Sequence, residues 1–249
     1  MYDASFRRRT LAELQAQRPI GAVARDFGVS RATLRSWLQQ PEALVPNTCC
    51  RCSGASPSAA PAYSALLGFY LGDGCVSVFR DTKVTLRVSC DAAYPRVTED
   101  VSELIGAMNP RGQVLRVRAP GVVVVQAMWK HWLCLFPQHG PGRKHERTIE
   151  LEAWQREIVE AFPADFLRGL FHSDGCRANN WTTRTVRGVK KRYDYPRWQF
   201  TNNSDDIRRL CCAALELLEI PWRQSNWKTI SVSTRGGVSR LDELIGLKA

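Results

Sequence analysis

The spacing of the hydrophobic positions divides this chain into three parts. In residues 1–46 apolar side chains recur at helical intervals in three short stretches, residues 10–17, 20–27 and 31–39. Residues 47–62 lose this periodicity and are rich in Ser, Ala, Pro and Gly, which is typical of a flexible linker. From residue 63 onward, apolar helix patterns alternate with strand-like runs. The pattern therefore predicts a small helical head, a linker and a larger α+β part.

The head, residues 1–46, has the spacing of a helix-turn-helix. Gly28 suits a tight turn between the second and third helices, and Ser30 is a good N-cap for the third. The apolar positions Val29, Leu34 and Trp37 are expected to face the core. The outward positions of the third helix, which would enter a DNA groove, are Arg31, Thr33, Arg35 and Ser36. A plain three-helix bundle without a DNA role is the alternative.

The larger part contains an internal repeat. ALLGFYLGDGC, residues 65–75, and DFLRGLFHSDGC, residues 165–176, both run from an apolar helix pattern into small-Asp-Gly-Cys. After the first segment the pattern predicts strands at 76–80 and 84–90, a helix at 96–108, strands at 114–118 and 122–128, and a short helix at 130–136. After the second it predicts strands near 181–187 and 192–202, a helix at 205–218, strands at 222–225 and 229–234, and a helix at 239–245.

Each repeat is thus predicted to be αββαββα. The boundaries are 63–147 for the first repeat, 148–162 for a connecting helix and 163–249 for the second repeat. The predicted fold class is α+β, with two pseudo-symmetric repeats behind an all-α helix-turn-helix domain.

Two carboxylates stand at corresponding places in the repeat. Gly68 and Gly72 are four residues apart, as are Gly169 and Ser173, and small residues at this spacing let two helices approach closely. The aspartates that follow, Asp73 and Asp174, would lie at helix C-termini, where the helix dipole disfavours negative charge. We expect Gly74 and Gly175 to form left-handed caps. Two facing carboxylates repel each other, and a bound Mg²⁺ would relieve the repulsion.

These segments resemble the paired motifs of the LAGLIDADG homing endonucleases. LLGFYLGDG (66–74) and LRGLFHSDG (167–175) match that motif in its Gly and Asp-Gly positions. Gly72 before the first acid, and His172 with Ser173 before the second, depart from it. The resemblance covers roughly residues 63–249 and leaves the helical head outside.

The resemblance implies a central helix pair, two DNA-binding sheets and cleavage of both DNA strands. It implies that Asp73 and Asp174 bind the metal and that a basic residue stands near each scissile phosphate. Lys144 and Lys248 are the candidates, with Arg143 or His145 as alternatives to Lys144. It further implies a polar residue near the water network: Asn202 fits in the second repeat, and the first has Cys90–Asp91 there.

The charge of the chain agrees with a polyanionic partner. Lys and Arg number 35 against 24 Asp and Glu, a net charge of +11. The cations on predicted DNA-facing strands are Arg80, Lys83, Arg87, Arg116, Arg118, Arg184, Arg187, Lys190, Arg192 and Arg197. A hairpin turning near Gly188 would present those of the second repeat, although a run of charge also occurs on any solvated face.

The nine cysteines form a poor disulfide framework because their number is odd and two pairs are adjacent. Reduced thiols indicate a cytoplasmic protein, associated with the nucleoid if the host is a prokaryote. No apolar run is long enough to span a membrane. Cys49 and Cys52 have zinc-ligand spacing, but with no second C-x-x-C or H-x-x-x-H we expect plain thiols rather than zinc.

The sequence predicts a DNA endonuclease that acts as a monomer on double-stranded DNA with Mg²⁺. The alternative is a transcriptional regulator on the same fold that binds without cutting, and the helix-turn-helix favours it. A transposase-like enzyme would need a different fold, which the repeat argues against.

Overall fold

The computed structural model describes residues 4–39, 49–79 and 83–248. The chain divides into two compact units, residues 1–53 and 54–249. We call them the helical unit and the two-sheet unit. Within the described ranges, every helix is too short or too polar to span a membrane.

The helical unit contains α1 (Ala4–Gln15), α2 (Ile20–Asp26), α3 (Arg31–Gln39) and a 3₁₀ turn, η2 (Cys50–Ser53). Leu34 and Trp37 are buried against Val23 and Val29, as the apolar spacing predicts. Gly28 has a φ of 63° in the turn, and Ser30 Oγ accepts a 3.0 Å hydrogen bond from the Thr33 amide. The first helix begins at Ala4, six residues before the predicted start, and Phe6 in the added segment packs against the core of this unit.

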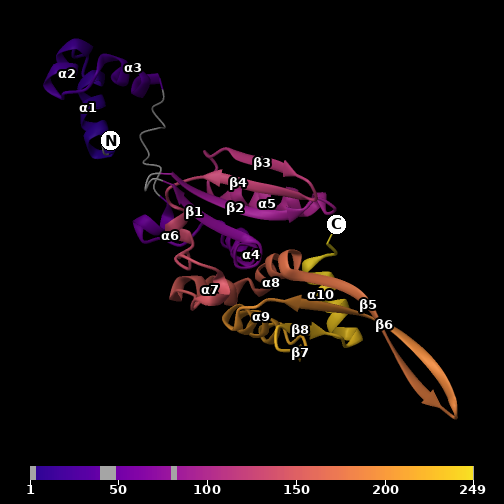
Figure 1. Cartoon of the computed structure of the whole chain (residues 1–249). Helices are drawn as coiled ribbons and strands as arrows, with labels where there is room; N and C mark the ends of the chain where they lie inside the picture. The colour runs from indigo at the N-terminus through magenta and orange to yellow at the C-terminus, as the bar shows by residue number, and fades with distance from the viewer. Residues whose placement is uncertain (1–3, 40–48, 80–82, 249) are drawn as a thin grey trace. The chain divides into compact units, whose positions relative to one another are not determined.

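The two-sheet unit consists of two repeats (Figure 1). The first contains α4 (Ala60–Leu71), β1 (Gly74–Phe79), β2 (Lys83–Asp91), α5 (Pro95–Met108), β3 (Val114–Ala119), β4 (Val122–Met128) and α6 (Trp132–Leu135). The 3₁₀ turn η3 (Lys144–Glu146) and α7 (Ala153–Ala161) connect the repeats. The second contains α8 (Pro163–Asp174), β5 (Gly175–Val186), β6 (Val189–Thr201), α9 (Asp205–Leu217), β7 (Arg223–Asn226), β8 (Thr229–Val232) and α10 (Arg235–Ile245).

The two antiparallel sheets have equivalent strand orders, β1-β2-β4-β3 and β5-β6-β8-β7. The predicted α+β class and αββαββα repeats are therefore confirmed. The β5–β6 hairpin differs from its counterpart in length, and Figure 1 shows it extending beyond the rest of its sheet. Its strands begin at Gly175 and Val189, before the predicted starts near 181 and 192, because pairing along the hairpin carries residues such as Asn179 into strand geometry. Its turn lies at Arg187–Gly188, where both residues have positive φ.

The two repeats meet through α4 and α8, which lie against each other at the centre of the unit (Figure 1). A Cβ added at Gly169 would lie 2.1 Å from the Ala65 carbonyl oxygen, and one at Gly68 would lie 2.4 Å from that of Phe166. Side chains larger than hydrogen are thus excluded on both sides of the helix crossing. The close approach expected from the four-residue spacing is confirmed.

The expected left-handed caps at Gly74 and Gly175 are wrong. Neither glycine has a positive φ, and each is the first residue of a strand. Their lack of a side chain serves close approach instead: a Cβ at Gly74 would lie 2.5 Å from Tyr70 Cα, and one at Gly175 would lie 2.5 Å from the Phe171 carbonyl oxygen.

Candidate metal centre and nucleic-acid interface

Asp73 and Asp174 come together where α4 and α8 end. Asp174 is the last residue of α8, and Asp73 lies two residues beyond α4. A Cβ at Gly72, next to Asp73, would lie 3.4 Å from Asp174 Oδ2 and 2.0 Å from Ser173 Oγ. The departures from the motif at positions 72 and 173 are therefore complementary, since Gly72 makes room for the hydroxyl of Ser173.

The carboxylates are held in a region that disfavours their charge. Burial raises the pKa of Asp174 to about 6, and the negative charge of Asp73 adds to that shift. Burial of the carboxyl also raises the pKa of Asp73, against the opposing effects of Lys248 and Lys144. The Asp73 side chain is nevertheless exposed at the surface, so water weakens the effect of burial on its pKa, whereas Asp174 is half-buried.

Lys144 lies at the end of α4. Its Nζ donates to the carbonyl oxygens of Gly72 at 2.7 Å and Gly74 at 2.8 Å, and also to that of Tyr70. These bonds satisfy backbone acceptors that the helix end leaves open. Burial lowers the pKa of Lys144 to about 8, while Asp174 and Asp73 act to raise it. Of the candidates Arg143, Lys144 and His145, the structure thus places Lys144 beside the acids.

Lys248 has the equivalent position at the end of α8. Its Nζ donates to the Ser173 carbonyl oxygen at 3.2 Å and lies 5.0 Å from the centre of the Tyr94 ring. His172 helps to hold the chain segment that carries this lysine, because its Nε2 lies 3.3 Å from the Gly246 carbonyl oxygen. Burial lowers the pKa of His172, which keeps the ring neutral. The polar His172 in the second motif therefore has a structural role that the sequence did not reveal.

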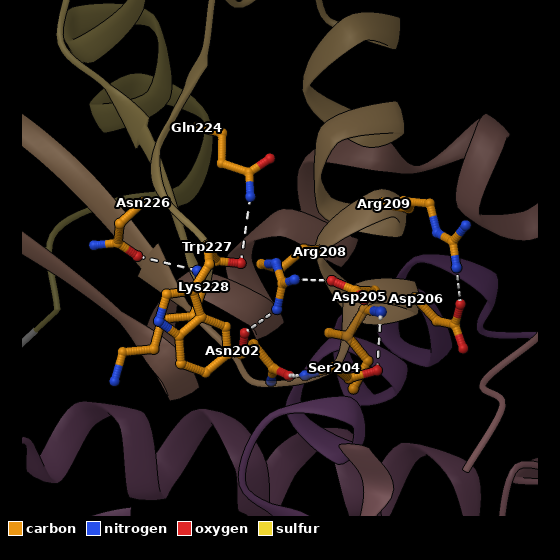
Figure 2. Close-up of polar contacts among 11 residues, drawn as sticks. Asn202, Ser204, Asp205, Asp206, Arg208, Arg209, Gln224, Asn226, Trp227 and Lys228 are labelled. Atoms are coloured by element: carbon orange, nitrogen blue, oxygen red, sulfur yellow. Dashed lines mark hydrogen bonds and ion pairs between the residues drawn. The ribbon is translucent and has the colours of Figure 1, made fainter. Parts of the chain in front are cut away.

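Asn202 connects the second sheet to the acid pair. Its Nδ2 donates to Asp174 Oδ2 at 2.6 Å. Figure 2 shows what fixes it: the Ser204 amide donates to Asn202 Oδ1 at 2.8 Å, and buried Arg208 donates to the Asn202 carbonyl oxygen at 2.5 Å. With its oxygen engaged by Ser204, the side-chain amide presents its N–H to Asp174.

The first repeat has a thiol at this place. Gly74 pairs with Val88 in the first repeat, and Gly175 pairs with Phe200 in the second. Cys90 and Asn202 each come two residues after that partner, so they occupy corresponding positions. Cys90 is buried, and burial raises its pKa to about 11, which leaves the thiol neutral at physiological pH. The doubt that the sequence left about this position is thus explained: Asp73 has no amide equivalent to Asn202.

Strand register determines which predicted DNA-binding cations share a sheet face. Trp198 and Phe200 are buried on the helix-side face of the second sheet, so Arg197 lies on the opposite face, which we call the open face. Arg184 pairs with Lys191, and both belong to the open face. Lys191 belongs to the basic run of the hairpin that the sequence shows, and only the register separates it from its basic neighbours.

Four of the predicted cations, Arg116, Arg118, Lys190 and Arg192, are exposed but alternate with the open-face residues along their strands, and their DNA-binding role stays a prediction. Arg116 Nε donates to Ser102 Oγ of α5 at 2.9 Å. Arg118 comes two residues later on the same strand and therefore points to the same face. Lys190 and Arg192 are an even number of residues from Trp198 on β6, so they point to the same side of the strand as Trp198. The guanidinium of Arg192 is 2.7 Å from Asp194. Lys83 and Arg87 are on the open face of the first sheet, and Arg187 is in the hairpin turn. Arg80 lies outside the described residues.

In the helical unit the predicted groove-reading residues have unequal surroundings. Arg35 is exposed on α3. Arg31 folds back toward α2, where its guanidinium lies close to Gly21, and the Thr33 hydroxyl is 2.7 Å from Ser30 Oγ. The DNA role of this helix stays a prediction.

The possible zinc ligands occur as a pair in each unit. In the helical unit Cys49 Sγ and Cys52 Sγ are 3.3 Å apart. In the two-sheet unit Cys134 Sγ is 3.8 Å from His131 Nδ1. The second pair has the spacing H-x-x-C, which the search for C-x-x-C and H-x-x-x-H missed. Zinc needs four ligands, so metal analysis of the purified chain tests the expectation of no zinc. Zinc that is lost in Cys52→Ser, but kept in Cys50→Ser, would overturn that expectation.

We expect the metal-free protein to lose stability as the pH rises from about 4 to about 7. The folded-state pKa of Asp174 is raised to about 6, above its unfolded value, so its stabilising contribution is present below the unfolded pKa and is lost as the pH passes the folded one. The loss should be about 1–2 kcal/mol. Urea unfolding in EDTA at pH 4.5 and 7.5 measures it. Asp174→Asn should remove most of this pH dependence, and an unchanged dependence in that variant would contradict the assignment.

Comparison with known proteins finds no match among protein-family models or curated proteins. Solved structures do match, and they define the class: the two-sheet unit has the LAGLIDADG fold. The structure of I-DmoI in complex with DNA and Mn aligns with a TM-score of 0.50 at 11% identity, over 75% of this chain and 97% of that one.

Two further structures align with lower TM-scores. I-AabMI bound to uncleaved DNA aligns with a TM-score of 0.46 at 12% identity, over 74% of this chain and 82% of that one. The N-terminal LAGLIDADG domain of DUF199/WhiA aligns with a TM-score of 0.45 at 14% identity, over 79% of this chain and 89% of that one. The resemblance predicted from the two motifs is confirmed at the level of the fold.

Proposed function

We propose that this chain is a DNA endonuclease that hydrolyses both strands of a double-stranded site in the presence of Mg²⁺. The observation that carries the proposal is the meeting of Asp73 and Asp174 at the ends of two closely packed helices, with a lysine at each end. A pair of carboxylates with raised pKa values is costly unless a cation binds there.

Each residue of the site then has a role. Asp73 and Asp174 hold the cation through oxygen ligands, and Asn202 orients the Asp174 carboxylate. A bound Mg²⁺ supplies Lewis acidity and lowers the pKa of water for attack on phosphorus. Lys144 and Lys248 place positive charge beside the acids, where it can offset the charge that develops on the phosphate.

The fold relatives support divalent metal and DNA as ligands. I-DmoI has been solved in complex with DNA in the presence of Mn, Ca and Mg. Both repeats and both acids of this protein are in one chain, so a single chain can offer a complete site. We therefore propose that the protein acts as a monomer.

A regulator that binds DNA without cutting it is the second candidate. Two observations favour it: the helix-turn-helix pattern of the helical unit, and the thiol of Cys90 where the other repeat has Asn202. If the protein is a regulator, it should bind a specific site and leave it intact.

The test is a library of random duplexes incubated with the protein in Mg²⁺, in Ca²⁺ and in EDTA, followed by sequencing of bound and cut molecules. The endonuclease proposal expects double-strand cuts at one recurring site in Mg²⁺ alone. Selective binding with no cut in Mg²⁺ would overturn it in favour of the regulator.

The salt dependence of DNA binding should distinguish the open-face cations from the cations next to them in the sequence. Lys191→Gln should reduce the slope of log Kd against log salt by about 1, because one phosphate contact is lost. Arg192→Gln, one residue away, should leave the slope nearly unchanged, because its guanidinium pairs with Asp194 and lies 5.1 Å from the centre of the Trp181 ring. Fluorescence anisotropy at several salt concentrations measures both; equal slopes for the two variants would contradict the register argument.

A further inference from the structure

The open face of the first sheet carries several large exposed apolar side chains among polar ones. Residues that pair directly across two strands point to the same face of a sheet. Gln126 pairs with Arg87 and with Leu115, so Leu115 lies on the open face. Val117, two residues further along the same strand, pairs with Val124 and also lies there. Met128 and Phe79 belong to the same face and are 62% and 58% exposed. Among the described residues of these four strands, the open-face cations are Lys83 and Arg87. Exposed apolar side chains therefore outnumber cations on this sheet.

The open face of the second sheet also exposes apolar side chains, Val186 and Val189 beside the hairpin turn, but it is richer in cations. Its cations come from three strands: Arg184, Lys191, Arg197 and Arg223. Tyr193 and Tyr195 stand between them, and Asn180 Nδ2 donates to the Tyr195 hydroxyl at 3.0 Å. This sheet presents hydrogen-bond donors where the first presents hydrocarbon.

The chemistry of the base edges predicts which DNA sequences each of these two surfaces would prefer. In the major groove, the apolar feature of a base pair is the C5 methyl group of thymine, and the strongest acceptor pair for arginine is O6 and N7 of guanine. A duplex lying across both sheets would meet hydrocarbon over one half and guanidinium groups over the other. The cations Lys83 and Arg87 border the apolar surface, which favours DNA over an apolar protein partner.

We propose that the two halves of the target differ in base composition: the half under the first sheet is rich in A·T pairs contacted through thymine methyls, and the half under the second is rich in guanines. The proposal rests on DNA binding as part of the proposed function, but it does not require cleavage.

Selection of bound duplexes from a random library in Ca²⁺ is the first test. The expected result is an asymmetric consensus with one A·T-rich and one G-rich half. Met128→Gln should relax the preference in the A·T-rich half alone, and Arg197→Met should relax it in the G-rich half alone. These two variants also identify which half lies under which sheet.

Base analogues then test the chemistry without changing the protein. Replacing thymine by deoxyuridine removes only the C5 methyl, and it should weaken binding by about fourfold per contacted methyl in the half under the first sheet. Replacing guanine by 7-deazaguanine removes the N7 acceptor, and it should weaken binding by roughly 5- to 150-fold per bidentate contact in the other half.

The outcomes separate the two proposals. Absence of selective binding to any duplex would overturn the proposed function itself. Selective binding with a consensus of equal composition in both halves, or with deoxyuridine costing as much under the second sheet as under the first, would overturn this inference and leave the proposed function standing.

Discussion

Asp73→Asn and Asp174→Asn should each abolish DNA cleavage while leaving DNA binding intact. Each change removes an anionic ligand from a site whose only purpose in the proposed reaction is to hold a cation beside the scissile phosphate. Loss of several kcal/mol of transition-state stabilisation corresponds to a fall in the cleavage rate on the order of 10³-fold or more. Single-turnover cleavage of a selected site measures the rate, and anisotropy in Ca²⁺ measures the binding.

Asp194→Asn is the matched control, since it makes the same change on the β5–β6 hairpin, where Asp194 pairs with Arg192. It should cleave at close to the rate of the unmodified protein. Asp174→Asn carries a second signature: removing a half-buried charge should stabilise the metal-free protein at pH 7.5. Cleavage that survives in both aspartate variants would remove these residues from the active site.

Gly169→Ala should strongly destabilise the two-sheet unit. The added Cβ would lie 2.1 Å from the Ala65 carbonyl oxygen and 2.7 Å from the Phe69 amide nitrogen, and both are backbone atoms of a packed helix. Relief requires the two helices to move apart, so the cost should reach about 3 kcal/mol, the upper end for overpacking. Urea unfolding in EDTA measures it.

Gly106→Ala provides the control within a helix of the same unit. A Cβ at Gly106 of α5 would meet no atom within 4 Å, and alanine favours helix over glycine by about 0.5–1 kcal/mol. The same substitution should therefore stabilise the protein at 106 and destabilise it at 169. Equal stability of the two variants would show that the helix interface tolerates separation. Because the acids stand at the ends of these helices, cleavage should fall together with stability at 169.

Much of the architecture could be predicted from local pattern. The motif is short, it recurs with its Asp-Gly 101 residues later, and its small residues are four apart; helix periodicity turns this spacing into one shared face. Strand boundaries were less certain in the second repeat, because the β5–β6 hairpin is stabilised by cross-strand pairing over 12 and 13 residues rather than by propensity. The caps at Gly74 and Gly175 failed for a related reason: close contact with the preceding helix, rather than the cap, requires glycine there.

The sequence by itself determined the helix pair, the repeated aspartates and the two four-stranded units, because these depend on residues close together along the chain. The tertiary structure decided the rest. Strand register alone assigned Arg197 and Lys191 to the open face and Arg116 to α5, since one step along a strand reverses the face. The fold alone brought Asn202, Lys144 and Lys248 to the acids, through contacts between segments 28 to 75 residues apart. Such contacts leave no periodicity in the sequence: the resemblance to a known family suggested these residues, and the packed chain shows their contacts.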